Sequence, residues 1–323
     1  MKLNFYQKTA ISTVGATLFL IMVGGIVRAA GAGLGCPDWP KCYGLWIPPM
    51  QVSDVPDGFD LASFNALKTW TEYINRLIGV LVGFFITANF LSSIRYRKTK
   101  PSVTISSFTA LVLVLFQAWL GGQVVRSGLS TGIITLHMLL AMIIVGVLLF
   151  ASFKSKEEFV LIRLHASQKR QFLNYGIALG ILVIIQMILG TQVREGVDTI
   201  KDVLLAPNRS LWIEELGLVY KVHRSFSWVL LLTTIAFSYR FFTYYSALSS
   251  TERKENRLFI VLSVAIPIGI VSQILVGVGL QWLHMPGLLQ VLHLIGVALL
   301  LSVLFIYILI LTQRTTASEA FAA

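Results

Sequence analysis

Eight apolar runs, each about 20 residues or longer, dominate this chain and limit what it can fold into. They lie near residues 10–30, 69–93, 104–126, 131–153, 171–193, 216–243, 257–280 and 287–312. A run of that length can cross a bilayer, and in hydrocarbon the backbone finds no water to bond, so each run must form a helix. The sequence therefore predicts an all-α membrane protein with eight transmembrane helices.

The charged residues predict how the chain crosses the membrane. Hydrophobic residues make up 56% of the chain and charged residues only 13%, which excludes an ordinary soluble domain. With the N-terminus inside, most of the 26 Lys and Arg residues lie in inner segments, as the positive-inside rule requires. We therefore expect a multi-pass protein of the bacterial inner membrane with both termini in the cytoplasm. The net charge of +11 follows from this topology, and no loop is long enough for the basic domain that nucleic-acid binding needs.

The polar residues indicate an internal duplication. Residues 1–155 and 156–323 carry four runs each, and a long outer loop follows the first run of each half, near residues 31–68 and 194–215. Matched positions recur at nearly constant spacing: His137 and His293 are 156 residues apart, as are Gln117 and Gln273, and Asn75 and His223 are 148 apart. A Gln-x-x-x-Gly segment occurs three times near the ends of runs, at Gln117/Gly121, Gln186/Gly190 and Gln273/Gly277. We expect two tandem four-helix bundles.

Four of these polar positions fall in one layer near the outer face, and three of them are histidines. Ionisable groups inside a membrane span are costly and mark function by default, although a single histidine there is more often a hydrogen-bonded packing residue. Imidazole is a common axial ligand of haem iron, and two helices can present one to each face of the ring. His223 and His293 form a complete pair, which predicts a bis-histidine haem in residues 156–323. In the first half Asn75 is a poor iron ligand, so iron held by His137 alone would keep an open coordination position.

The first outer loop contains both cysteines of the chain, Cys36 and Cys42. Prolines between them favour a turn, and an oxidising compartment outside the membrane favours a disulfide. The pair could be a structural staple or a redox-active pair that exchanges electrons with a thiol carrier. Two cysteines alone cannot form a four-ligand zinc site.

Several charged residues cluster at the outer ends of the runs. Glu72 precedes Asn75 by about one turn and could relay protons or orient a bound molecule, or it could simply pair with Arg76. Arginines end the first, third and fifth runs and begin the second and sixth, at Arg28, Arg126, Arg194, Arg76 and Arg224. Guanidinium groups bind carboxylates such as haem propionates, and long side chains also anchor helices at the membrane surface.

These motifs together resemble the haem A synthase family over essentially the whole chain. The resemblance is carried by Gly24–Arg28, Gly35–Pro40 with Cys42, Glu72–Arg76, Gln117 with Gly121 and Gly122, His137, His223 with Arg224, and His293. It implies an oxidoreductase that converts the C8 methyl of haem O to the formyl group of haem A for cytochrome oxidase assembly. It also implies haem b bound to His223 and His293, and a substrate haem site with His137 as ligand and Glu72 as catalytic acid. Many relatives have histidine at the position of Asn75.

The resemblance also implies partners: membrane lipid, haem O, an electron-transfer partner and the haem O synthase, with a homo-oligomer left open. An alternative from the residues alone is a dihaem b-type electron-transfer subunit, but that function would require two complete histidine pairs. A transporter is a second alternative, because internal repeats are common in transporters. Its polar residues would be expected near the midplane instead of the outer layer.

Overall fold

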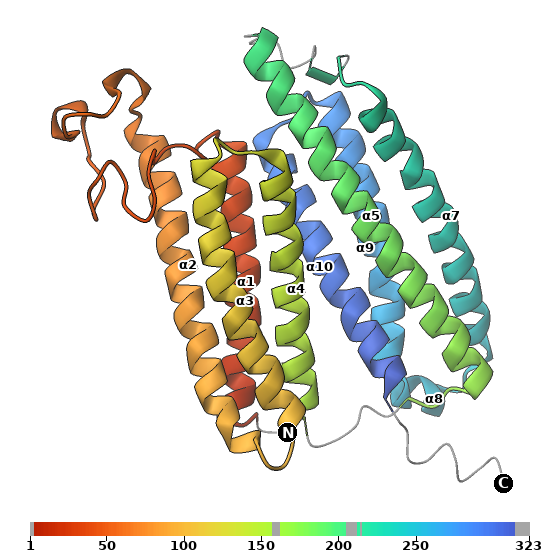
Figure 1. Ribbon diagram of the computed structural model, residues 1–323. Helices are drawn as coiled ribbons and strands as arrows, with labels where there is room; N and C mark the ends of the chain where they lie inside the picture. Colours follow the sequence, from red (N-terminus) through yellow and green to blue (C-terminus); the bar gives the residue numbers. More distant parts are fainter. Residues whose placement is uncertain (1–2, 157–161, 205–211, 214, 314–323) are drawn as a thin grey trace. The chain divides into compact units, whose positions relative to one another are not determined.

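The computed structural model describes residues 3–156, 162–204, 212–213 and 215–313. Eight long helices are each long and apolar enough to span a membrane. They are α1 (Phe5–Ala29), α2 (Ala66–Ser93), α3 (Pro101–Arg126), α4 (Thr131–Lys154), α5 (Ala166–Leu204), α7 (Leu218–Ala247), α9 (Arg257–Trp282) and α10 (Gly287–Thr312) (Figure 1). Short helical segments are η1 (Val52–Asp54), η2 (Leu61–Ser63), η3 (Ile94–Tyr96) and α8 (Ser250–Glu255), and the described residues contain no β-strand. The predicted all-α, eight-helix membrane fold is confirmed.

Side-chain caps explain why two helices begin before their apolar runs. The Asn4 side chain accepts a hydrogen bond from the Gln7 amide, and the Gln7 side chain returns one from the Asn4 amide, so α1 begins at Phe5. Asn65 accepts from the Lys68 amide at 3.0 Å and starts α2 at Ala66. Polar first turns extend both helices beyond the runs read from hydropathy.

Helix α5 departs from the prediction at its C-terminal end. The predicted outer loop 194–215 is wrong over residues 194–204, which continue the helix to Leu204. Arg194 pairs with Asp198 at 3.1 Å across one turn, and such a pair stabilises a helix outside hydrocarbon. Val197 is buried in a cluster with Trp212, Leu216 and Met285. Residues 205–211 and 214 of the predicted loop lie outside the described residues.

The chain forms two compact units: residues 1–155 with 286–295, and residues 156–285 with 296–323. In the first unit α1 packs on α2 and α4, and α3 packs on the same two helices, which closes a four-membered ring. Its interior contains apolar side chains from all four helices, namely the buried Val82, Ile86, Ala110, Leu120, Leu140, Ile144 and Leu148 with Val14, Ala16 and Leu20 beside them.

The second unit is centred on aromatic rings. Phe172 of α5 contacts Phe259 of α9 edge to face, with ring centroids 5.2 Å apart. Tyr307 of α10 stacks on Phe259 at 5.7 Å and meets Phe237 of α7 at 6.0 Å. Each pair adds about 0.5–1.5 kcal/mol to the burial of the rings themselves. Four helices of this unit are therefore held together at one level.

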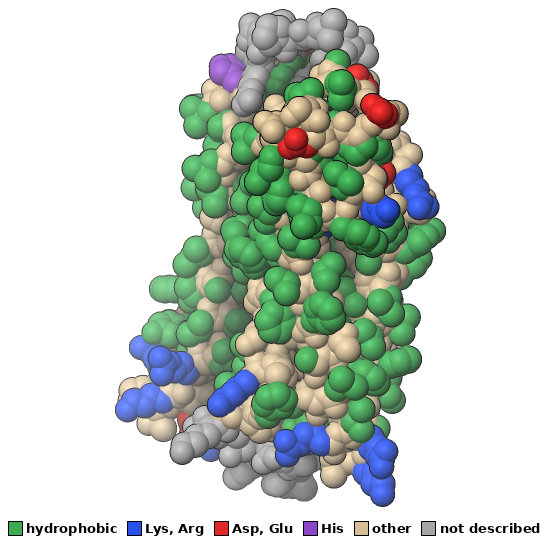
Figure 2. Space-filling model, turned by 90° about the vertical axis from the view of Figure 1, so that its left-hand side faces the viewer, with side chains coloured by type: hydrophobic (Ala, Val, Ile, Leu, Met, Phe, Trp, Pro, Cys, Tyr) green, Lys and Arg blue, Asp and Glu red, His purple; other side chains and the backbone are tan. Residues whose placement is uncertain are grey.

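Hydrophobic side chains cover the membrane-facing surface of the helices. Figure 2 shows a band of them on one face, with most of the visible Lys and Arg side chains at one end and Asp and Glu side chains at the other. Phe84, Leu115 and Phe108 are among the exposed large apolar residues of the first unit. Exposure of this kind is what lipid contact requires of a multi-pass protein.

A methyl group at Gly176 should destabilise the second unit. An alanine Cβ there would lie 2.9 Å from the ring of Tyr307, which is fully buried and cannot retreat, whereas at Gly180 the nearest atom would be 4.0 Å away. Both Gly→Ala changes gain the same helix propensity. Gly176→Ala should therefore be less stable than Gly180→Ala by about 1–3 kcal/mol, measured as thermal unfolding in detergent. Equal stability of the two variants would contradict the packing described here.

Candidate functional site

The segment between α1 and α2 folds around a disulfide. Cys36 and Cys42 are bonded to each other, which confirms the predicted pair, and both are fully buried. The Asp38 carboxylate accepts hydrogen bonds from the amides of Tyr43 at 2.6 Å and Gly44 at 3.0 Å. Both residues have positive φ, so the carboxylate stabilises a left-handed turn. We call the end of the first unit that carries this segment the loop end.

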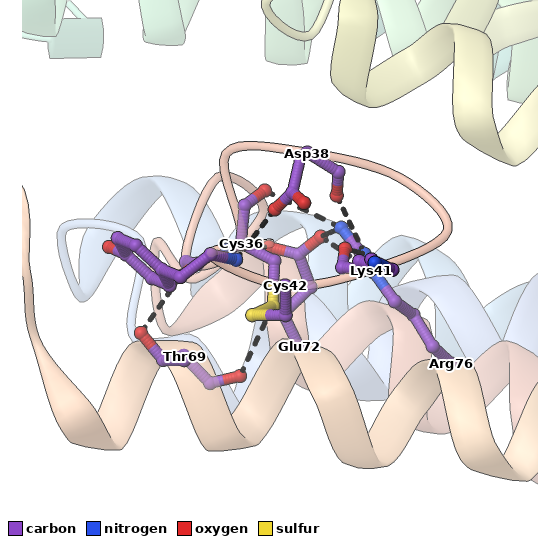
Figure 3. A network of polar contacts seen from close by, with 9 residues as sticks. Cys36, Asp38, Lys41, Cys42, Thr69, Glu72 and Arg76 are labelled. Atoms are coloured by element: carbon purple, nitrogen blue, oxygen red, sulfur yellow. Dashed lines mark hydrogen bonds and ion pairs between the residues drawn. A yellow bond between two sulfur atoms is a disulfide. The ribbon is translucent and has the colours of Figure 1, made fainter. Parts of the chain in front are cut away.

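Two side chains of α2 hold this loop from below (Figure 3). The Oε2 atom of Glu72 accepts a hydrogen bond from the Cys36 amide at 2.9 Å, and Oε1 pairs with the Arg76 guanidinium one turn further along. Arg76 donates to the carbonyl oxygens of Asp38 at 2.8 Å and Lys41 at 2.9 Å. The Glu72 side chain is thus buried with both of its oxygens bonded.

Of the two readings of Glu72, the structure shows the ion pair with Arg76. A catalytic role for Glu72 stays a prediction, and so does contact of Arg76 with a propionate. A buried carboxylate is costly unless donors surround it, and here the donors belong to the disulfide loop. Glu72 therefore connects the cysteine pair to the face of α2 that carries Asn75.

His137 lies two turns into α4 in a site built by α3. The Nε2 atom of Gln117 donates to the His137 carbonyl oxygen at 3.0 Å. One turn after Gln117, the Gly121 backbone approaches the imidazole so closely that a Cβ would lie 3.4 Å from Cε1. The His137 Nδ1 and Gln117 Oε1 atoms are buried without hydrogen-bond partners.

His223 in the second unit repeats this arrangement on α7 and α5. Gln186 Nε2 donates to the His223 carbonyl oxygen at 2.9 Å, and a Cβ on Gly190 would lie 3.3 Å from the imidazole Cε1. The His223 Nδ1 and Gln186 Oε1 atoms are again buried without partners. The sequence revealed the Gln-x-x-x-Gly segments but not that each one contacts a histidine.

Asn75 faces α1 at the loop end of the first unit. A Cβ on Gly24 would lie 3.9 Å from the Asn75 Oδ1 atom, which is buried without a partner. On α3 of the same four-helix unit, the Trp39 indole of the disulfide loop rests on Gly122, where a Cβ would meet it at 2.9 Å. Trp39 thus lies against the glycine pair of α3 whose other member backs His137, a contact that sequence reasoning missed.

His293 lies on the part of α10 that belongs to the first unit, whereas His223 belongs to the second. The pairing of the two histidines as iron ligands therefore stays a prediction. In the first unit the α10 segment packs on α1, where a Cβ on Gly25 would clash with Leu294.

The arginines predicted to contact propionates do not all lie at helix ends, because α5 continues past Arg194 to Leu204. Arg28 and Arg126 lie in the last turns of α1 and α3, and Arg224 lies at the start of α7 with its guanidinium 5.7 Å from the Tyr220 ring centroid. Arg194 is engaged with Asp198 on α5. The role of these arginines toward an anionic ligand stays a prediction.

The histidine sites fit a haem better than a metal ion held by protein alone. Across the described part of the chain, no three His, Cys, Asp or Glu residues gather as a metal-ion ligand set. His137 and His223 instead stand singly and half-buried, each with its imidazole against a glycine of the neighbouring helix. An imidazole that binds haem iron through Nε2 uses Nδ1 as a donor, and Nδ1 is the buried atom without a partner in both residues.

Alkylation should find no free thiol in the resting protein. The chain has only two cysteines, and they are bonded to each other. Protein denatured in N-ethylmaleimide without reductant should gain no label by mass spectrometry, and protein reduced first should gain two. Full labelling of both thiols without reductant would contradict the bonded state.

Comparison with known proteins places the whole chain in one family. The family model described as cytochrome oxidase assembly protein, COX15-CtaA, matches residues 7–305. A haem A synthase of Wolbachia pipientis is 24% identical over 93% of this chain and 90% of its own length. One from Shewanella oneidensis is 29% identical over 45% of this chain and 44% of its own, and one from Paracoccus denitrificans is 28% identical over 55% and 52%.

The matches to the latter two relatives span about half the length of each protein. The match to the family model instead extends from the first turn of α1 to the last turns of α10, across all eight long helices. It includes the disulfide loop, Glu72 and the three histidines of the polar layer. The chain therefore belongs to the COX15-CtaA family of cytochrome oxidase assembly proteins.

Proposed function

We propose that this protein is a haem A synthase, which oxidises the C8 methyl of haem O to the formyl group of haem A. The observation that carries the proposal is the family match over residues 7–305, together with relatives that bear this name. Singly placed histidines on α4 and α7, with buried Nδ1 atoms, support it, because imidazole is a common axial ligand of haem iron.

The first unit is the proposed substrate site. His137 binds the iron of haem O on one face of the ring, and Asn75 on α2 leaves the opposite face without a strong ligand. Conversion of a methyl to a formyl group removes four electrons and four protons when water supplies the oxygen atom. Each proton needs an acceptor, and Glu72 is the buried carboxylate one turn from Asn75.

The proposed role of Glu72 follows from its contacts. The Cys36 amide and the Arg76 guanidinium hold its carboxylate in one place. A charged carboxylate can accept a proton from the oxidised carbon or from water. Once the carboxyl group has passed that proton on, Arg76 stabilises the carboxylate charge again. Trp39 lies against Gly122 at the same end of the unit.

The second proposed site binds haem b through His223 and His293. These two histidines would hold the haem, and the chemistry it would supply is electron transfer between the substrate site and an external partner. We place the protein in the bacterial inner membrane, with both termini in the cytoplasm and the disulfide loop outside. Its proposed partners are lipid, the haem O synthase and the electron-transfer partner.

The competing function is a dihaem b-type electron-transfer subunit. Extraction of haems from the purified protein, followed by chromatography, separates the two. Haem B together with haem O or haem A supports the synthase. Two haem B molecules per chain and no other haem would support the electron-transfer subunit.

Loss of His137 or Glu72 should stop haem A formation. In a strain without its own enzyme, His137→Ala and Glu72→Gln should accumulate haem O or a hydroxylated intermediate, since a strong ligand or the proton acceptor is missing. Asn75→His should remain partly active, because histidine is the residue of many relatives. His165→Ala is the control, because His165 lies outside the spans and contacts neither site. Normal haem A production by His137→Ala would contradict a substrate site in the first unit.

The low-spin haem should depend on His223 and His293. His223→Ala or His293→Ala should each abolish the low-spin signal in electron paramagnetic resonance, because iron then loses one of two strong ligands. His137→Ala, expressed without haem O, should keep that signal. An unchanged low-spin spectrum in either of the first two variants would refute this ligand pair.

A further inference from the structure

Three helix pairs share one local arrangement at the polar layer. In α3/α4, α5/α7 and α1/α2, a glycine of the first helix faces the layer residue of the second. A Cβ on the glycine would lie 3.4 Å from His137, 3.3 Å from His223 and 3.9 Å from Asn75 respectively. The layer position thus faces a glycine of the preceding helix in all three pairs, whether its residue is histidine or asparagine.

The residue one turn before each glycine separates these pairs into two kinds. Gln117 precedes Gly121 and Gln186 precedes Gly190, and each donates to the carbonyl oxygen of the facing histidine. Leu20 precedes Gly24 and packs into the apolar core of the first unit, and the facing residue is Asn75. The two helix pairs with glutamine thus have histidine at the layer position, and the pair with leucine in place of glutamine has asparagine there.

The chemistry of the contact fixes the orientation of each glutamine. A carbonyl oxygen only accepts, so the atom that meets it must be Nε2, and Oε1 is an acceptor that points elsewhere. Both Oε1 atoms are buried without a donor, and both histidine Nδ1 atoms are buried without a partner. Each site therefore combines a buried amide oxygen and a buried imidazole nitrogen, neither with a hydrogen bond, on two residues already bonded to each other.

We propose that Gln117 and Gln186 are positioning residues that hold His137 and His223 as iron ligands, an inference that rests on the proposed haem sites. Nε2 fixes the main chain of the histidine, and Oε1 accepts the Nδ1–H, directly or through one water. That bond selects the tautomer whose Nε2 atom faces the iron.

Leu20 explains the single ligand of the first unit. An imidazole at position 75 would face Gly24 without a partner for its Nδ1–H. Asn75→His alone should therefore leave the substrate iron without a second strong ligand. Asn75→His with Leu20→Gln should give the purified protein, loaded with haem O, a second low-spin signal.

Gln186→Leu tests the role in the haem b site, with Gln192→Leu on the same helix as its matched control. The full-length protein is purified, and haem b per chain, the low-spin resonance and the midpoint potential are measured. Gln186→Leu should weaken haem retention about 10–100-fold, shift the resonance and raise the potential, because the imidazole becomes a weaker donor. Gln192→Leu should leave all three unchanged. Gln186→Glu, which as a neutral acid keeps one donor and one acceptor, should restore retention.

The outcomes separate this inference from the proposed function. If Gln186→Leu matches Gln192→Leu in all three readouts, the positioning role is wrong while the haem site stands. If the wild-type protein binds no haem, both are wrong. Should Gln186→Leu fail to fold, the double variant decides: a second low-spin signal in Asn75→His alone overturns the proposal, and its appearance only with Leu20→Gln supports it.

Discussion

A buried carboxylate and its donors determine the loop end of the first unit. Glu72 cannot lie inside a membrane helix without partners, and the partners it has are the Cys36 amide and Arg76. Arg76 in turn binds two carbonyl oxygens of the disulfide loop. These bonds together hold the disulfide loop against α2, one turn from Asn75. Removal of either charge leaves the other buried and alone, which is the costly case.

The eight spans could be predicted from the sequence because hydrocarbon leaves the backbone one option. The pairing of Cys36 with Cys42 could also be predicted, since the chain has no other cysteine. The end of α5 was not, because residues 194–204 are polar and hydropathy cannot distinguish a polar helix from a polar loop. The caps at Asn4 and Asn65 were not predicted either, because one or two side-chain hydrogen bonds decide each helix start and hydropathy does not register them.

The candidate site was predictable as a list of residues but not as a set of contacts. The sequence identified His137, His223 and Glu72 as candidates, because titratable groups are rare in apolar runs. It did not show that Gln117 and Gln186 bind main-chain oxygens, or that Trp39 rests on Gly122. Those contacts join residues 20 to 83 positions apart, on different helices or loops, and no local pattern encodes them.

The glutamine contact has a consequence for mutagenesis. Because Gln117 and Gln186 bind a main-chain carbonyl oxygen, this bond does not require the histidine side chain. Alanine at position 137 or 223 therefore removes an imidazole and leaves the interhelical cross-link in place. In such a variant the two helices lose the packing of the ring on its glycine and keep the hydrogen bond between side chain and main chain.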